Sequence, residues 1–228
     1  QCCGDGGQSA VVGGVVGRAL RLDGFTSLIR RNDGAAPKIT GAFTLESWVA
    51  LAAYPWNWAP IIDHERDEHA GYYFGIGPLG EVGLDLSLGG HWLSCRSEPK
   101  LKLRRFAHVA AVFDPDAGIT LFVDGSVARR CERRELQPSA DLGSAGGASG
   151  GAMLAAGVDL LIGMNHEKRV PSHPVRPQAT LPAWFTIDGI LDEVKIHARA
   201  RGAEVLRADF AAAKPPAEPE IPQRVMPS

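Results

Sequence analysis

Apolar residues recur in short runs along the chain, most of them with an apolar side chain at every second position, and Gly or Pro separates one run from the next. This period of two places successive side chains on opposite faces of a β-strand, whereas an amphipathic helix has a period near 3.6. About a dozen such segments occur, more than one open sheet usually holds. The pattern therefore predicts an all-β protein, folded as a two-sheet antiparallel jelly-roll sandwich. The predicted strands are ALRLDG, SLIRR, FTLESWVAL, PIID, GYYFGIG, EVGLDLSL, HWLSCRS, FAHVAAVFD, ITLFVDG, SVARRC, DLLIGM and FTIDGILDEVKIHA.

Tight turns between these runs support the antiparallel arrangement. PLGE (78–81) and SLGGH (87–91) flank EVGLDLSL, and DPDAG (114–118) separates FAHVAAVF from ITLFVDG. Gly, Pro and Asp favour such turns because they supply the backbone angles and local hydrogen bonds that turns need. In FTLESWVAL, Trp48 falls on one face and aliphatic residues on the other, so we expect a central strand with Trp48 packed in a core.

The ends of the chain differ in composition from its centre. Residues 1–16 form a Gly-rich lead-in, and residues 17–212 form the predicted domain. Within it, the small, Gly-rich segment 139–157 is typical of a flexible insertion, and 199–212 is the only convincing helical stretch, a short C-terminal one. Residues 213–228 are rich in Pro and resemble a linker, so we expect a further domain beyond them, cut away from this piece.

Charge and cysteine content narrow the classes of function. The chain has 24 Lys and Arg against 26 Asp and Glu, which is not the excess of positive charge that nucleic-acid or anionic-membrane binding requires. No run approaches the roughly 18 apolar residues of a membrane span, so we expect no membrane insertion. The four cysteines contain no CxxC pair, which argues against a zinc knuckle. Cys95 and Cys131 each end a predicted strand and suit one disulfide in an oxidising compartment; the alternative is two buried thiols.

Four sequence blocks carry a resemblance to a known family. GRALRLDG (17–24), FTLESWV (43–49), FAHVAAVFDPDAGITLFVDG (106–125) and GILDEVKIHARA (189–200) follow one another in this order. They resemble the conserved strands of the laminin-G-like (LamG) domains, which belong to the concanavalin A-like lectin/glucanase jelly rolls. In place of the family's usual tryptophan, the third block has Phe106. The resemblance implies a concanavalin A-like sandwich in a secreted protein, although a fold does not fix a function.

The stretch DHERDEH (63–69) resembles a catalytic or metal-binding site more than any other short stretch of the chain. His64 and His69 are five positions apart, so they do not fit the H-E-x-x-H zinc motif, whose histidines lie four apart on a helix. Glycosidases of this fold carry E-x-D-x-E on one strand face; Glu65 and Asp67 match it, but His69 occupies the third position. The plainest interpretation is a solvated loop between two strands.

A ligand-binding interpretation of the same stretch is also open. The segment NHEK follows an apolar run as DHER does, so the two could frame a polar groove if they leave the sheet on one side. Tryptophan rings offer flat faces for sugars, and Trp56 and Trp58 flank a loop bounded by Pro, which makes them the best exposed candidates. Trp184 is a further nearby aromatic residue. The expected ligand-binding residues are Trp56, Trp58, Asp63, His64, Glu65, Asp67, Trp92, His166 and Glu167.

A structural calcium ion is a further expectation, because the resembled family often carries one and calcium prefers oxygen ligands. Asp23 and Asp192 belong to the first and last of the four blocks. If the first and last strands are neighbours, the two carboxylates could approach each other. Alternatively, Asp23 serves the turn before Gly24, and Asp192 accepts hydrogen bonds from backbone N–H groups.

We therefore expect a non-catalytic, extracellular carbohydrate-binding module of a larger secreted protein, found outside the cell or in the periplasm. Its expected partners are a glycan or polysaccharide and a neighbouring domain of the same polypeptide. The alternative is a structural or protein-interaction domain that packs on and positions a neighbouring catalytic domain. A glycoside hydrolase ranks only third among the hypotheses, because the motif lacks the second catalytic carboxylate.

Overall fold

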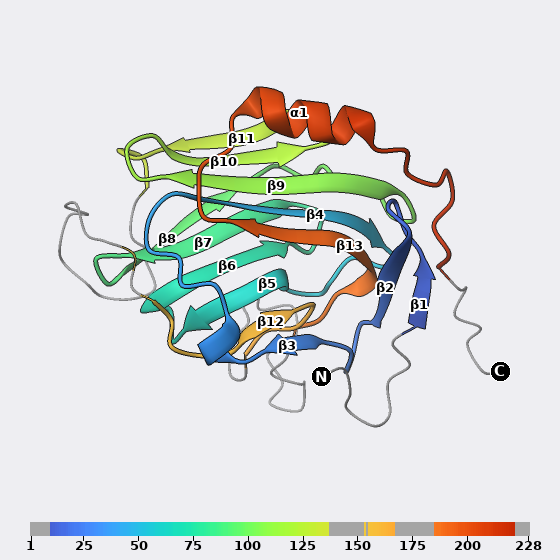
Figure 1. Cartoon of the computed structure of the whole chain (residues 1–228), viewed down its shortest axis with the longest axis horizontal. Coiled ribbons are helices and arrows are strands. Elements are labelled where there is room, and N and C mark those ends of the chain that lie inside the picture. Colours follow the sequence, from blue (N-terminus) through green and yellow to red (C-terminus); the bar gives the residue numbers. More distant parts are fainter. Residues whose placement is uncertain (1–9, 137–152, 154, 167–184, 222–228) are drawn as a thin grey trace.

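The computed structural model describes residues 10–136, 153, 155–166 and 185–221. Two antiparallel sheets stack face to face (Figure 1), with strand orders β1-β2-β13-β4-β9-β10-β11 in sheet A and β3-β12-β5-β6-β7-β8 in sheet B. The prediction of an all-β two-sheet jelly roll is confirmed. The strands are β1 (Ala10–Gly13), β2 (Arg18–Asp23), β3 (Ile29–Arg31), β4 (Phe43–Leu51), β5 (Ala59–Arg66), β6 (Ala70–Ile76), β7 (Val82–Leu88), β8 (His91–Arg96), β9 (Phe106–Asp114), β10 (Gly118–Val123), β11 (Ser126–Glu132), β12 (Leu160–Ile162) and β13 (Asp188–His197).

Strand β4 shows how the alternation of side chains builds this sandwich. It lies between β13 and β9, so it is a central strand, as predicted. Phe43, Leu45 and Val49 belong to the main core between the sheets, whereas Trp48 packs in a second apolar cluster. The outer face of sheet A therefore carries apolar residues as well, and these need their own cover.

Helix α1 (Ala203–Ala212) provides part of that cover and begins four residues later than the start predicted for it. It lies along the outer side of sheet A near β10 and β11 (Figure 1). Its buried residue Leu206 packs on Ala110, Val112 and Phe122 of the sheet. A helix of this length has little stability alone, so this packing keeps it folded.

The chain after the helix continues across the same face. Ile221 is buried in the cluster that contains Trp48 and Phe106, and Arg104 Nη2 donates a hydrogen bond of 2.8 Å to its carbonyl oxygen. The predicted linker is therefore packed on the domain as far as Ile221, where it supplies apolar surface that sheet A needs; a further domain beyond it stays a prediction. Residues 222–228 lie outside the described part.

The structure also describes parts of the predicted N-terminal lead-in and of the predicted insertion. Residues 10–13 of the lead-in form β1, which pairs with β2, so this part of the lead-in belongs to sheet A. Most of the segment 139–157 lies outside the described residues. Of its described part, Met153 is buried in the main core, which a flexible insertion alone would not predict.

The predicted disulfide is confirmed. Cys95 on β8 and Cys131 on β11 are bonded, with their Cα atoms 5.9 Å apart. These strands are the last ones of the two sheet orders, so the bond links sheet A to sheet B at one edge of the sandwich. Cys2 and Cys3 lie outside the described residues. Among the described elements, no helix is long and apolar enough to cross a membrane.

Candidate functional site

The stretch DHERDEH is not the loop that its charges predict. Strand β5 continues to Arg66, and only residues 67–69 form the turn to β6. Asp63, His64 and Glu65 are 0%, 3% and 5% exposed. Asp63 is paired with Tyr73 of β6 and Glu65 with Gly71. The solvated-loop prediction is therefore wrong for residues 63–65: backbone pairing with β6 outweighs their polar character.

Asp63 lies on the outer face of sheet B, and the structure brings His166 to it. The His166 backbone N–H donates to Asp63 Oδ2 over 2.8 Å, and His166 Nδ1 lies 3.3 Å from Asp63 Oδ1. Burial alone would lower the pKa of His166, but the Asp63 carboxylate and the charge of Glu65 raise it overall. The two polar segments thus meet in a partly buried pair of His166 and Asp63 rather than as the frame of an open groove. Glu167 lies outside the described residues.

His64 points to the other side of the strand, toward the core. Its ring meets Tyr72 edge to face, with centroids 5.5 Å apart, and Nε2 lies 3.1 Å from the Val158 carbonyl oxygen. Burial lowers the pKa of His64, because a buried imidazolium loses its hydration. His64 therefore fills space in the core as a neutral ring, and it does not share a face with Asp63.

Glu65 and Asp67 do not share a strand face either. Glu65 Oε2 accepts a hydrogen bond of 2.8 Å from the Glu68 backbone N–H, which closes the turn. Asp67 is exposed and has a φ of 51°, because the strand ends at Arg66. The expected E-x-D-x-E alternation is therefore broken at its second position, and a glycosidase site built on Glu65 and Asp67 is not formed.

Trp58 and Trp92 are buried, against the expectation that Trp58 is exposed. They cluster with Tyr73 on the outer face of sheet B, at 8% and 5% exposed. Gly83 makes room for Trp58, since a Cβ atom there would lie 2.6 Å from the indole ring. The guanidinium of Arg96 lies over the ring, 4.5 Å from its centroid. Arg96, rather than a sugar, thus occupies this aromatic face. The sequence signal that could have indicated the burial of Trp58 is a glycine, Gly83, at an outward-facing position of β7.

Trp56 remains accessible, together with a neighbour that the sequence did not single out. Trp56 and Tyr54 are 37% and 39% exposed, and both belong to the loop between β4 and β5. The Tyr54 hydroxyl donates to the Leu101 carbonyl over 2.8 Å, and Trp56 packs edge to face on Phe185, with centroids 4.9 Å apart. Both rings are therefore held in place while part of each meets solvent.

The loops around Tyr54 are tied to one another. The backbone N–H groups of Lys100 and Leu101 both donate to the Gly80 carbonyl, and Arg104 N–H donates to the Leu51 carbonyl. Three connections, residues 52–58, 77–81 and 97–105, thus form one end of the sandwich, which we call the aromatic loop end. Strand β5 separates it from the turn at Asp67 by about 26 Å at 3.3 Å per residue.

The two aspartates expected to hold calcium do not come together. Asp23 lies opposite Asp188 on β13, four residues along that strand from Asp192, which is about 13 Å. Asp23 Oδ1 accepts hydrogen bonds from three backbone N–H groups, and these bonds lower its pKa although burial opposes them. Asp192 Oδ2 accepts from the N–H groups of Val15 and Val16. The pair does not fit one shared ion, and both alternative roles are the ones observed; whether the chain binds a structural calcium ion stays untested.

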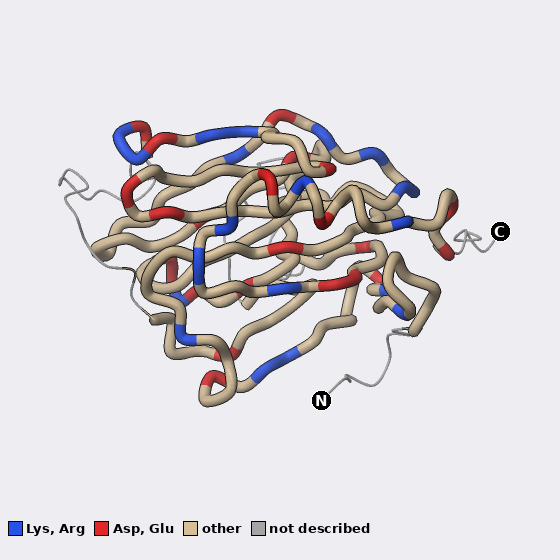
Figure 2. Tube along the Cα trace, turned by 45° about the horizontal axis from the view of Figure 1, so that its top comes forward, with Lys and Arg blue, Asp and Glu red and all other residues tan. Residues whose placement is uncertain are grey.

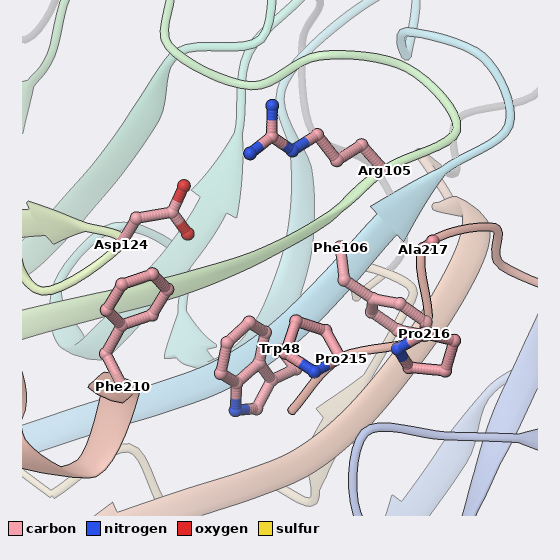
Figure 3. A pocket seen from close by; sticks show the side chains of 8 residues that line it. All are labelled: Trp48, Arg105, Phe106, Asp124, Phe210, Pro215, Pro216 and Ala217. Carbon is pink, nitrogen blue, oxygen red and sulfur yellow. The ribbon is translucent and has the colours of Figure 1, made fainter. Parts of the chain in front are cut away.

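A pocket opens on the outer face of sheet A, away from all the residues predicted as ligands. Its volume is about 240 Å³. Figure 3 shows aromatic rings and prolines along one side of it and a guanidinium and a carboxylate on the other. Helix α1 and the segment after it contribute walls, which is why the sequence alone did not indicate it. The lining residues are Trp48, Arg105, Phe106, Asp124, Phe210, Pro215, Pro216 and Ala217; we call this the sheet-A pocket.

A buried carboxylate next to the pocket anchors helix α1. Glu46 Oε2 lies 3.3 Å from His108 Nε2, Glu46 Oε1 lies 3.0 Å from His197 Nε2, and Arg201 Nη1 donates to Oε1. Arg201 Nη2 also lies 2.7 Å from Asp209 Oδ2 on the helix. Burial would raise the pKa of Glu46, but the hydrogen bonds from His108 and Arg201 outweigh it and lower the pKa to about 2. The carboxylate is therefore ionised and links the helix to β4.

Comparison with known proteins decides the family. Residues 24–156 match the model of the Laminin_G_3 family of the concanavalin A-like lectin/glucanases superfamily, which is more than half of the chain. The chain belongs to this family. The Laminin_G_3 assignment confirms the resemblance stated above. A search of curated proteins finds no match.

Solved structures share this Laminin_G_3 fold at low sequence identity. Domain 4 of AbnA, an extracellular arabinanase from Geobacillus stearothermophilus in complex with arabinotriose, has a TM-score of 0.60 at 18% identity and covers 90% of this chain and 82% of that one. The sialidase CBM40 of Ruminococcus gnavus, bound to sialyllactose, has a TM-score of 0.54 at 11% identity, over 84% and 96%. The binding domain of Paraclostridial Mosquitocidal Protein 1 has a TM-score of 0.58 at 11% identity over 91% of this chain. This chain spans 46% of that domain.

Proposed function

We propose that this Laminin_G_3 chain is a non-catalytic carbohydrate-binding module that contacts glycans through the aromatic loop end. The observation that carries the proposal is the pair of immobilised, partly exposed rings Tyr54 and Trp56. Two proteins of the same fold are described in complex with sugars, arabinotriose and sialyllactose. A location outside the cell or in the periplasm accords with the disulfide, which needs an oxidising compartment.

The loop end suits sugar recognition for physical reasons. Rings that are already fixed lose little entropy when a sugar stacks on them. Exposed Lys100 and Lys102 on the adjacent connection 97–105 can donate hydrogen bonds to hydroxyl groups. Basic and acidic residues are interspersed along the described chain (Figure 2), so a neutral glycan is favoured over a strongly charged polymer.

Replacing Trp56 with Ala should weaken glycan binding about tenfold, since a stacking ring is worth on the order of 1.4 kcal/mol. Tyr54→Ala should act in the same direction, whereas Tyr54→Phe keeps the ring and should retain most binding. A glycan array and affinity electrophoresis measure the effect. If Trp56→Ala binds as the wild type does, the loop end is not the contact surface; if the wild type binds no glycan, the function itself is refuted.

The absence of catalysis is part of the proposal. The Asp63 carboxylate is engaged by His166 and by the Glu65 backbone N–H, and Glu65 closes a turn, so neither carboxylate has the freedom that a nucleophile or proton donor needs. Incubation with β-glucan should release no sugar. Hydrolysis that disappears in Glu65→Gln would contradict this.

A second candidate function, a domain that packs on a neighbour, is favoured by one observation. Leu79 and Leu103, also on the aromatic loop end, are exposed at 63% and 40%. Exposed aliphatic side chains beside aromatic ones suit a protein interface as well as a sugar site. Hydroxyl-radical footprinting of the longer polypeptide would show these leucines protected if they face a neighbouring domain. Equal labelling in the longer and the isolated chain would exclude that role.

A further inference from the structure

The sheet-A pocket has the features of a preorganised small-ligand site. Trp48 and Phe210 are stacked, with ring centroids 5.7 Å apart and planes 24° apart, and Figure 3 shows Pro215 beside Trp48 and Pro216 beside Phe106. Rings confined in this way leave a cavity with fixed walls. Its volume of about 240 Å³ is below the roughly 300–1,000 Å³ of pockets for drug-sized ligands. The pocket therefore suits one small ring rather than a chain.

The helix wall of the pocket is fixed from behind. Arg201 bridges buried Glu46 of β4 and Asp209 of the helix, and Asp209 immediately precedes Phe210 of the pocket. The opposite wall is fixed as well, because the His108 backbone N–H donates to Asp124 Oδ1 over 2.9 Å. The cost of ordering the site on binding is therefore small.

The polar groups of the pocket indicate the charge of its ligand. Figure 3 shows the Arg105 guanidinium and the Asp124 carboxylate on the same side of the cavity. Within the described residues no ion pair joins them, and the one bond that Asp124 accepts is to Oδ1, which leaves Oδ2 as an acceptor. A cation would meet Arg105 and an anion would meet Asp124. A neutral ligand with several hydroxyl groups can accept from the guanidinium and donate to the carboxylate at once.

We propose that the sheet-A pocket binds one sugar ring, as a second saccharide site separate from Tyr54 and Trp56. The apolar face of the sugar packs on Phe210 and Pro215, and its hydroxyl groups bond Arg105 and Asp124. This inference rests on the proposed carbohydrate-binding function. Both sites border the connection 97–105, through Leu101 and through Arg105, so one module makes two contacts with a glycan surface, which raises avidity.

Saturation-transfer NMR with a panel of free neutral monosaccharides tests the pocket. Asp124→Asn should weaken monosaccharide binding severalfold, since the amide still accepts from His108 N–H and tolerates the φ of 51°, but lacks the negative charge that strengthens a hydrogen bond from a sugar hydroxyl. Asp116→Asn makes the same change at the far end of β10 and serves as the control. Phe210→Leu should weaken binding too, and thermal melting checks that each variant is folded.

The outcomes separate this proposal from the function on which it rests. If the wild type and Trp56→Ala bind monosaccharide equally while Asp124→Asn binds it more weakly, the pocket is the second site. If Asp124→Asn binds like the wild type, or if no monosaccharide binds while the glycan array is positive, the pocket proposal is overturned and the carbohydrate-binding function stands. If neither assay shows any sugar, both are refuted.

Discussion

Replacing Glu46 with Ala should lower the free energy of unfolding by about 3–5 kcal/mol, because it removes the buried carboxylate that Arg201, His108 and His197 share. Glu46 is 2% exposed and is the common partner of His108, His197 and Arg201. Urea denaturation followed by circular dichroism measures the change. Helix α1 should be affected first, since Arg201 is its link to β4.

The matched control is Glu204→Ala. Glu204 pairs with Arg207 on the exposed side of helix α1, and an exposed pair of this kind contributes at most about 0.5 kcal/mol. Similar losses for the two variants would show that the Glu46 cluster adds nothing beyond an ordinary surface pair, and would contradict the account of the helix anchor.

The pH dependence of stability follows from the same carboxylate. The pKa of Glu46 falls from an ordinary 4.5 to about 2 in the folded chain, so its contribution is complete above pH 4.5 and is lost as the pH drops toward 2. Glu46→Gln should therefore flatten the stability profile in this window. An unchanged acid slope in Glu46→Gln would show that other groups control acid unfolding.

Loss of the Cys95–Cys131 disulfide is the second large effect expected. The bond closes a loop of 36 residues, and the loop-entropy relation gives about 4 kcal/mol of stabilisation for that length. Because it joins the edges of the two sheets, its loss should let β8 and β11 separate first. The variant with Cys95→Ala and Cys131→Ala should therefore unfold at lower urea concentration than the oxidised wild type.

A reducing agent provides the control for this prediction. Dithiothreitol should lower the urea midpoint of the wild type and leave that of the double variant unchanged, because the double variant lacks the bond. Any effect of reducing Cys2 and Cys3 would appear in both proteins, since both contain these residues. Identical midpoints for the oxidised and the reduced wild type would refute the stabilising role of the bond.

The sequence by itself determined the layers of the fold and indicated the disulfide as one of two alternatives. Alternation in FTLESWVAL sorted Phe43 and Trp48 onto opposite faces, and the strand does lie in the centre of sheet A. Cys95 and Cys131 were predictable because strand ends were visible in the pattern. Period and turn chemistry are local properties of the chain, so they can be read locally.

The site depended on contacts between distant segments. Whether Asp63 stays in water or pairs in a strand depends on β6 and on His166, and whether Trp58 is exposed depends on Gly83 and Arg96. Likewise, the sheet-A pocket exists only because residues 203–217 fold back over β4 and β9. Charge and aromaticity mark residues that need a partner, but the partner, and with it the energy of burial, is fixed only when the sheets and the C-terminal segment assemble.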